Sequence, residues 1–370
     1  MYMLRQRIMN VGSLSSTPTF RYKLPSTGMY SAFQLVIDAN RYATRADIDL
    51  VYPLEVEVTK IELVEGGSHA LLSVPATQLD ALNYWSFGRP NARRYRQEES
   101  TGNLLHLFMM GGRDLYDTEY GYDMSRLGET YFEYTHSMSA DAAERFDVSD
   151  HEITLYGYRW MGSGTPSYKG YLRARQLAAY TTTATGALKT INVPIGNPIR
   201  RIGIQAKSRA TTLGGTFTKA ELLVNNGEYS PVIITSPMHW AMGEVSEYGL
   251  NNELGGIDYM VSTGENEIPR WWSYFQTLQA SSYGYAGEMN LEVHGISLPL
   301  RVKANTTGNM EVMFNSRGYG FQKCLRVGFD HFRDGSDLLQ TRGMGALDLQ
   351  LTEAAASKEC AVFVEDVVSY

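Results

Sequence analysis

Short stretches in which apolar and polar residues alternate recur along the whole chain. In residues 54–64 (LEVEVTKIELV), every second residue from Leu54 to Val58 is apolar, and the residues between them are acidic. A period of two is typical of a strand with one buried face. The same kind of run occurs at residues 152–158, 199–206, 219–224, 290–294, 309–314, 347–351 and 361–368. Many short strands separated by turn residues predict a β-sandwich or a β-barrel.

Helical patterns are few and short. Residues 76–85 follow Pro75 and residues 238–248 follow Pro237, which suits the first turn of a helix. A third helical pattern covers residues 270–280. Because these helices do not alternate regularly with the strands, the sequence disfavours a doubly wound parallel sheet.

The two halves of the chain resemble each other. The predicted strand that begins at Lys60 and runs into a glycine turn is similar to the one that begins at Lys219. In both halves a second apolar stretch, a proline (Pro75 or Pro237) and a short helical pattern follow. The spacing between the two lysines nearly equals the spacing between the two prolines, so the sequence indicates a duplicated unit.

The closing segments of the two halves also match. Residues 131–160 and 347–370 each consist of a strand, a stretch of small residues and a second strand. After the first of them, residues 161–170 (MGSGTPSYKG) contain three glycines and a proline, which is typical of a turning connector. A length of 370 residues suits two domains. The predicted division is an N-terminal arm at residues 1–19, a first domain at 20–162, a connector at 163–172 and a second domain at 173–370.

The composition favours contact with other protein chains. The basic residues are 24 Arg against 9 Lys, and the chain holds 25 Tyr, 16 Met and 5 Trp. Protein–protein interfaces enrich Arg, Tyr, Trp and Met and deplete Lys, although a host codon preference would also produce the arginine excess. The net charge of −7 shows no general footprint of nucleic-acid binding.

No catalytic or metal-binding motif stands out. None of the seven histidines has a zinc-type spacing to a cysteine, and the sequence has no phosphate-binding or nucleophile-elbow pattern. Cys324 and Cys360 form no disulfide framework, which suggests folding in a reducing compartment. No apolar run reaches the roughly 18 residues of a membrane-spanning helix, and residues 1–10 (MYMLRQRIMN) read as an amphipathic arm, not as a secretory signal.

Three clusters allow two interpretations each. Residues 330–337 (DHFRDGSD) predict a polar turn, with a weak calcium site between loops as the alternative. Residues 89–96 (RPNARRYR) predict a solvated loop or a contact with the acidic surface of a neighbouring subunit, with nucleic acid or anionic lipid as the alternative. The aromatic residues at 271–275, with Tyr283 and Tyr285, predict a core or an intersubunit contact, with a sugar-binding surface as the alternative.

Two segments at the start of the second half resemble a known family. Residues 191–206 (INVPIGNPIRRIGIQA) bring a proline-containing approach into an Arg-Ile-x-Ile strand, and residues 217–227 (FTKAELLVNNG) form a strand that ends in a turn. Together they look like the opening strand pair of the double jelly-roll major capsid proteins, a family of tailless icosahedral DNA viruses that runs from membrane-containing bacteriophages to adenovirus. The resemblance implies an all-β fold of two tandem eight-stranded antiparallel jelly rolls with a few short helices. Because the chain lacks very long loops, it also implies short towers.

The same resemblance implies a function. A major capsid protein would form homotrimers that act as pseudo-hexameric capsomers and tile the shell of a virion assembled in the host cytoplasm. The implied partners are other copies of the chain, minor capsid or vertex proteins and, through residues 1–10, an internal membrane. The resemblance implies neither sequence-specific nucleic-acid binding nor enzyme activity. It also implies no catalytic residue, no cofactor and no metal.

Two other functions remain open at this stage. An extracellular carbohydrate-active or carbohydrate-binding β-sandwich would place paired carboxylates near residues 271–275, and Glu265 and Glu267 are the candidates. A viral spike or vertex protein would share the β-rich composition but occur in few copies per particle.

Overall fold

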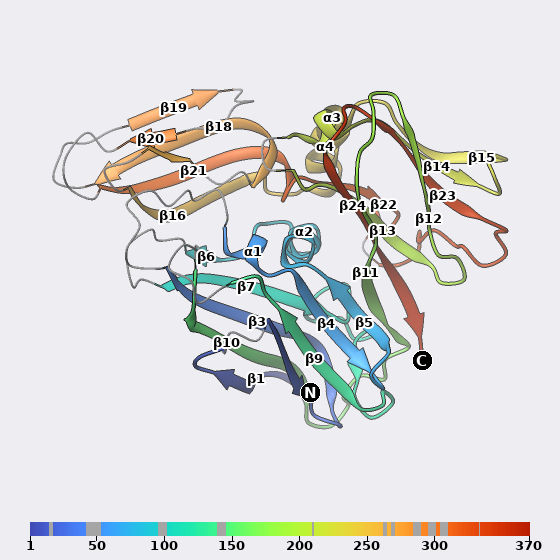
Figure 1. Cartoon of the computed structure of the whole chain (residues 1–370). Helices are drawn as coiled ribbons and strands as arrows, with labels where there is room; N and C mark the ends of the chain where they lie inside the picture. Colours follow the sequence, from blue (N-terminus) through green and yellow to red (C-terminus); the bar gives the residue numbers. More distant parts are fainter. Residues whose placement is uncertain are drawn as a thin grey trace.

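The computed structural model describes most of the chain (Figure 1). The described residues are 1–14, 18–41, 53–94, 102–138, 146–208, 211–261, 265–267, 271–283, 290–294, 301–303, 310–332 and 334–370. Strands dominate, and four short helices occur within these residues. None of those helices combines the length and the apolar character needed to cross a membrane.

The strands of the first half form two facing sheets. One sheet has the order β1 (Tyr2–Val11), β10 (Phe146–Met161), β3 (Met29–Arg41), β7 (Gly102–Met110), and short strands β6 (Arg93–Arg94) and β8 (Tyr122–Asp123) extend it. The other has the order β2 (Thr19–Lys23), β9 (Thr130–Thr135), β4 (Lys60–Glu65), β5 (His69–Val74). Counting the eight principal strands along the chain gives 1-8-3-6 and 2-7-4-5, which is a jelly roll. Helix α1 (Leu54–Glu57) precedes β4, and helix α2 (Ala76–Phe87) follows β5.

The second half repeats this order. Among the described residues, one of its sheets has the order β11 (Gly170–Thr181), β24 (Glu359–Ser369), β13 (Ile199–Ala206), β22 (Cys324–Gly328). The facing sheet is β12 (Leu188–Asn192), β23 (Leu347–Glu353), β14 (Phe217–Val224), β15 (Tyr229–Ile234). Helix α3 (Leu213–Thr216) precedes β14, and helix α4 (Pro237–Tyr248) follows β15. The predicted duplication and the predicted fold of two eight-stranded jelly rolls are therefore confirmed.

A smaller sheet is inserted into the second roll between α4 and β22. Its order is β16 (Glu253–Val261), β21 (Met310–Phe321), β18 (Trp272–Tyr283), β19 (Asn290–His294), and β17 (Glu265–Glu267) pairs beside it with β20 (Arg301–Lys303). Figure 1 shows this orange sheet projecting at the upper left, at the opposite end of the molecule from both chain termini. The sequence did not predict this inserted sheet, because a run of ordinary short strands gave no sign that it forms a separate sheet; the implied short towers stay a prediction.

Two local predictions were also wrong. Residues 54–57 form helix α1 instead of a strand, and residues 272–283 form strand β18 instead of a helix. Both segments mix apolar and polar residues over a few turns at most, so their periodicity alone does not separate helix from strand, and tertiary contacts decide. In α1 the acidic residue Glu55 points into the protein, which removes the distinction between a polar and an apolar face.

The N-terminal segment is part of the first roll. Residues 2–11, for which the sequence predicts an arm, form strand β1 and pair along their length with β10, from Tyr2 opposite Met161 to Val11 opposite Ile153. The predicted connector lies between β10 and β11, and β11 begins within it at Gly170. The division into domains at residues 163–172 otherwise stays a prediction.

Each roll has an apolar core between its sheets, and one continuous sheet joins the rolls. In the first roll Phe33, Leu35 and Ile37 of β3 are fully buried, and Ile202 and Ile204 of β13 are the counterparts in the second. The rolls join where β5 pairs in parallel with β11, with Leu72 opposite Ala174 and Ser73 opposite Arg175. The sheets β2-β9-β4-β5 and β11-β24-β13-β22 thereby become a single eight-stranded sheet.

A buried histidine makes the first roll sensitive to acid. His151 shares a hydrogen bond of 2.9 Å with the Tyr134 hydroxyl, and its ring lies 5.3 Å from that of His136. Burial, together with the charge of His136, lowers the pKa of His151 to about 3 from its ordinary 6.5. Between these values the unfolded chain binds a proton that the folded chain does not, so stability falls by about 1.4 kcal/mol per pH unit as the pH drops below 6.5.

Replacing His151→Gln should remove this part of the acid sensitivity. Between pH 7.5 and pH 5, the variant should lose about 2 kcal/mol less unfolding free energy than the natural chain, as measured by urea denaturation at both pH values. His69→Gln is the matched control, because His69 is exposed. Equal losses in the natural chain and in His151→Gln would contradict the prediction.

Candidate assembly surface

Helix α2 makes side-chain contacts that join the two rolls. Gln78 donates hydrogen bonds to the side-chain oxygens of Gln176 in β11 (2.8 Å) and Gln205 in β13 (3.2 Å). Further along the same face of the helix, the Trp85 ring stacks on Phe363 of β24, with ring centroids 5.8 Å apart and ring planes at 12°. The helix after β5 thus packs across the outer face of the second roll's β11-β24-β13 sheet.

Buried charges reinforce this joint. Arg201 of β13 donates to the Ser86 hydroxyl (2.7 Å) and to the Glu365 carboxylate (2.9 Å). Arg200 donates to Glu365 (3.3 Å) and to Asp330 (2.7 Å). Burial works to raise the pKa of Glu365, but the charges of Arg201 and Arg200 outweigh it and hold that pKa below its usual value. Glu365 therefore stays ionised and fixes both arginines at the joint.

A second buried network anchors the inserted sheet on the first roll. Arg93 donates to both oxygens of Asp80 (2.9 and 2.7 Å) and to Glu55 (3.3 Å). Gln322 donates to the same two carboxylates, and the Trp271 indole donates to Glu55 at 3.0 Å. The basic cluster predicted at residues 89–96 is therefore divided: Arg93 is internal, while Arg89 and Arg94 are exposed. Positions 95 and 96 lie outside the described residues.

Helix α4 and strand β15 carry an exposed apolar surface on the second roll. Tyr229 and Ile233 of β15 are each 50% exposed, and Met238 and Met242 of α4 are 44% and 37% exposed. Beside them lies a groove of about 600 Å³ between β15, α4 and β22. Apolar side chains gathered in this way on two adjacent elements are typical of a protein-binding surface.

The groove has a charged but poorly solvated floor. Glu244 of α4 is 4% exposed, and burial raises its pKa well above the ordinary value against the opposing charge of Arg326. The Arg326 guanidinium lies 3.5 Å from the centre of the Tyr248 ring. The groove therefore offers apolar residues around polar groups that are already desolvated.

Strand β1 carries the matching kind of surface on the first roll. Tyr2 and Leu4 are 59% and 43% exposed, and β1 lies at the free edge of its sheet in the described chain. Arg5 and Arg7 are exposed on the same strand, and the Arg5 guanidinium lies 3.9 Å from the centre of the Tyr156 ring. The edge is therefore apolar, aromatic and basic.

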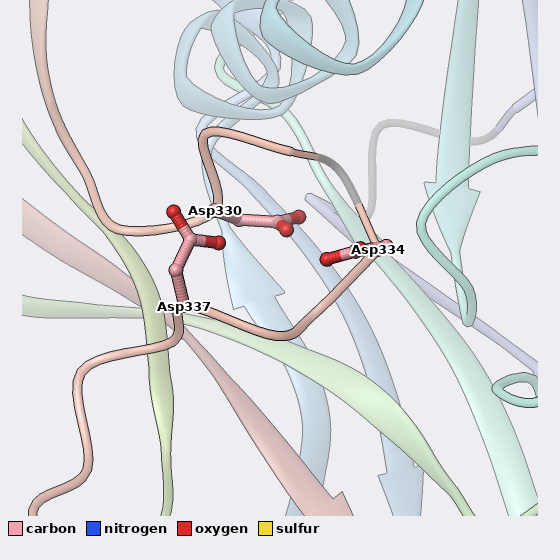
Figure 2. Close-up of side chains that lie close together, drawn as sticks. All are labelled: Asp330, Asp334 and Asp337. Atoms are coloured by element: carbon pink, nitrogen blue, oxygen red, sulfur yellow. The ribbon is translucent and has the colours of Figure 1, made fainter.

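Three aspartates lie together on the loop after β22. Figure 2 shows Asp330, Asp334 and Asp337 around one turn of this loop, and one oxygen from each lies within 4.8 Å of the others. Each carboxylate accepts a hydrogen bond from a backbone N–H of the same loop, at Gly335, Ser336 and His331 respectively. These bonds close the predicted polar turn, and calcium binding there stays the alternative prediction.

Asp330 has a structural role as well. Its side chain is fully buried, and it accepts a hydrogen bond from Arg200. Burial works to raise the pKa of Asp330, but the charge and hydrogen bond of Arg200 lower it overall. Asp330→Asn should therefore reduce the free energy of unfolding by about 2 kcal/mol, because Arg200 loses a charged partner inside the protein. Urea denaturation measures this, with the exposed Asp334→Asn as the control, and equal effects of the two variants would refute it.

Two of the aromatic candidates are core residues, while Tyr274 is half-buried and Tyr285 lies outside the described residues. Trp271 and Trp272 are 2% and 1% exposed, and the Trp272 indole donates to the Ser316 hydroxyl at 3.1 Å. Buried rings offer no face to a sugar, so the prediction of a core position is confirmed for both. Glu265 and Glu267 lie in β17 opposite β20, and the structure describes neither of their side chains. Cys324 and Cys360 are buried free thiols.

Sequence reasoning missed the surface of α4 and β15. Its apolar residues are ordinary for an amphipathic helix and an edge strand, and only the fold reveals that several of them stay exposed. The available signal was the difference between the repeats, because Ala81 in the first helical pattern corresponds to Met242 in the second when both helices are counted from their first residue.

The two rolls, each with the strand order 1-8-3-6 and 2-7-4-5, define a double jelly-roll protein. No known protein-family profile matches the chain, and no curated protein sequence matches it. Solved structures do match over almost the whole length.

These structures are capsid proteins of icosahedral viruses. The crystal structure of the STIV major capsid protein matches with a TM-score of 0.60 and 10% identity, over 100% of this chain and 98% of that chain. The major capsid protein of bacteriophage PM2 matches with a TM-score of 0.54 and 8% identity, over 100% and 98% of the chains. A chain of the PBCV-1 virus capsid matches with a TM-score of 0.53 and 9% identity, over 99% and 93%. At such identities the shared property is the double jelly-roll fold, which confirms the fold that the resemblance implied.

Proposed function

We propose that this chain is the major capsid protein of an icosahedral virus, and that it trimerises into pseudo-hexameric capsomers that tile the virion shell. The observation that carries the proposal is the pair of complete jelly rolls, side by side and in the same strand order. Capsid proteins with this architecture match the chain from end to end. Three copies of a two-roll chain supply six similar blocks, which can occupy a hexagonal position.

The rigid joint between the rolls supports this role. A tiling subunit must present its flanks at fixed angles, and the buried contacts of Gln78, Trp85 and Arg201 hold the two rolls in one orientation. The exposed apolar surfaces on β1, α4 and β15 then provide contacts between copies. Repeated lateral contacts can each be weak, because a closed shell engages many of them at once.

Further partners belong to the same proposal. Minor capsid or vertex proteins would bind the assembled capsomers, and an internal membrane would lie beneath the shell. Assembly would take place in the host cytoplasm, without catalytic activity, a cofactor or sequence-specific nucleic-acid binding.

The test is the mass and shape of the purified chain. Light scattering should give about three times the chain mass of 41.4 kDa, and negative-stain electron microscopy should show hexagonal particles. A monomer at every concentration would contradict the proposal. Trimers present in only a few copies per virion would instead support a spike or vertex protein, and specific binding on a glycan array by a monomer would support the carbohydrate-binding alternative.

A further inference from the structure

Helices α2 and α4 occupy equivalent places in the two rolls. Each has 12 residues and follows the fifth principal strand of its roll. Each ends at a glycine in the left-handed conformation, Gly88 or Gly249, whose N–H donates to a carbonyl four residues earlier. Residues at the same position along the two helices can therefore be compared directly.

The face of α2 that meets the second roll is buried. Its third, sixth and tenth residues, Gln78, Ala81 and Trp85, are at most 2% exposed. Gln78 and Trp85 make the hydrogen bonds and the ring contact with β11, β13 and β24 described above. Burial of this face therefore depends on the neighbouring roll.

The same face of α4 is exposed. Its third, sixth and tenth residues, His239, Met242 and Ser246, all face solvent in the single chain. Met242 is a large apolar residue in the position where α2 has the buried Ala81. The second roll thus has the helix of the joint but lacks the sheet against which its counterpart packs.

The edge strands next to these helices differ in the same way, because one is paired within the chain and its counterpart is not. Within the chain, β5 of the first roll pairs with β11, the first strand of the second roll. The equivalent strands are β15 and β1, and in the described chain each is the last strand of its sheet. One copy therefore carries one half of a second joint at β15 and α4 and the other half at β1.

The two halves are complementary in chemistry. Strand β1 holds the exposed Arg5 and Arg7 and no acidic residue, whereas α4 presents the exposed Glu247 and has no lysine or arginine. Exposed apolar residues lie on both, with Leu4 among those on β1 and the two methionines on α4. Apolar area flanked by opposite charges favours a specific contact over random association.

We propose that α4 and β15 of one copy dock on the β1 edge of the first roll of the next copy, so that the joint within each chain is repeated between chains. The inference rests on the proposed capsid function and names the two surfaces that it uses. Because the surfaces differ, the contact is head-to-tail and closes a ring when the rotation permits. Joints within and between chains then alternate around a trimer.

The first experiment disrupts the apolar part of the contact. Met242→Asp should abolish the trimer in light scattering at concentrations where the natural chain is fully trimeric, with an unchanged circular dichroism spectrum. Met313→Asp is the matched control, since Met313 is 46% exposed on β21 of the inserted sheet, and it should remain trimeric. A trimeric, folded Met242→Asp variant would overturn the inference.

The second experiment locates the partner surface without weakening it. A photo-crosslinking amino acid at position 242 of the full chain should join two copies, and mass spectrometry should place the other end in β1 or in the adjacent strands β10 and β3, which are the counterparts of the strands β11, β24 and β13 that α2 contacts. Crosslinks from a trimer to any other segment would overturn the inference and leave the capsid proposal standing. Failure of the natural chain to form oligomers would overturn both.

Discussion

Replacing Arg93→Met should lower the free energy of unfolding by about 3–5 kcal/mol, because it leaves two carboxylates in the protein interior without their cation. The side chains of Glu55 and Asp80 are both 0% exposed, and that of Arg93 is 1% exposed. Burial raises the pKa of Asp80 overall and the charge of Arg93 opposes that rise, so replacing Arg93 removes the main group that stabilises the carboxylate form of Asp80. Thermal and urea unfolding of the purified chain measure the loss.

Two further variants separate the buried charge from other effects. Arg94→Met, on the same short strand but with an exposed side chain, should change stability by no more than about 0.5 kcal/mol. Adding Glu55→Gln and Asp80→Asn to Arg93→Met should recover much of the loss, since the unpaired charges are then removed. Equal effects of Arg93→Met and Arg94→Met would show that the network does not stabilise the fold.

Much of the fold could be predicted because its signals are local. The alternation in residues 199–206 and 219–224 reflects strands with a buried side, and these became β13 and β14. The similarity between the segments after Lys60 and Lys219 reflects the same two strands and helix in each roll. Such signals need no knowledge of distant residues.

The parts that could not be predicted depend on distant partners. Glu55 is buried because Arg93 and Trp271 lie against it, and neither contact can be read from residues 54–57. Arg93 looks like part of a basic surface patch until Asp80 is placed beside it. The candidate assembly surface is a stronger example, since Met242 is a normal helix residue in sequence and becomes informative only beside its buried counterpart Ala81.

A capsid subunit needs two kinds of joint with different strengths. The joint inside the chain forms once, during folding, and uses buried charges such as Arg201 with Glu365 that tolerate no misplacement. The proposed joint between chains uses exposed methionines and a strand edge, whose contacts can form and separate during assembly. The same geometry can thus be permanent in one place and reversible in the other.

Trp85→Ala should be the most damaging truncation at the permanent joint, with a loss of about 3–5 kcal/mol in unfolding free energy. The Trp85 side chain is 2% exposed, and the Arg201 guanidinium lies 5.7 Å from the centre of its ring. Arg201 also forms an ion pair with Glu365. Removing the indole therefore leaves a cavity against Phe363 and also loosens a buried ion pair.

This substitution should also weaken the coupling between the rolls. Because Trp85 belongs to the first roll and packs on the second, its loss should split or broaden the thermal transition, as calorimetry would show, whereas a defect confined to one core would mainly shift it. Phe332→Ala, on a side chain that is 76% exposed, is the control and should leave both the midpoint and the width unchanged. A single sharp transition at the natural midpoint in Trp85→Ala would mean that the β5–β11 pairing and the charged network hold the rolls together without the aromatic contact.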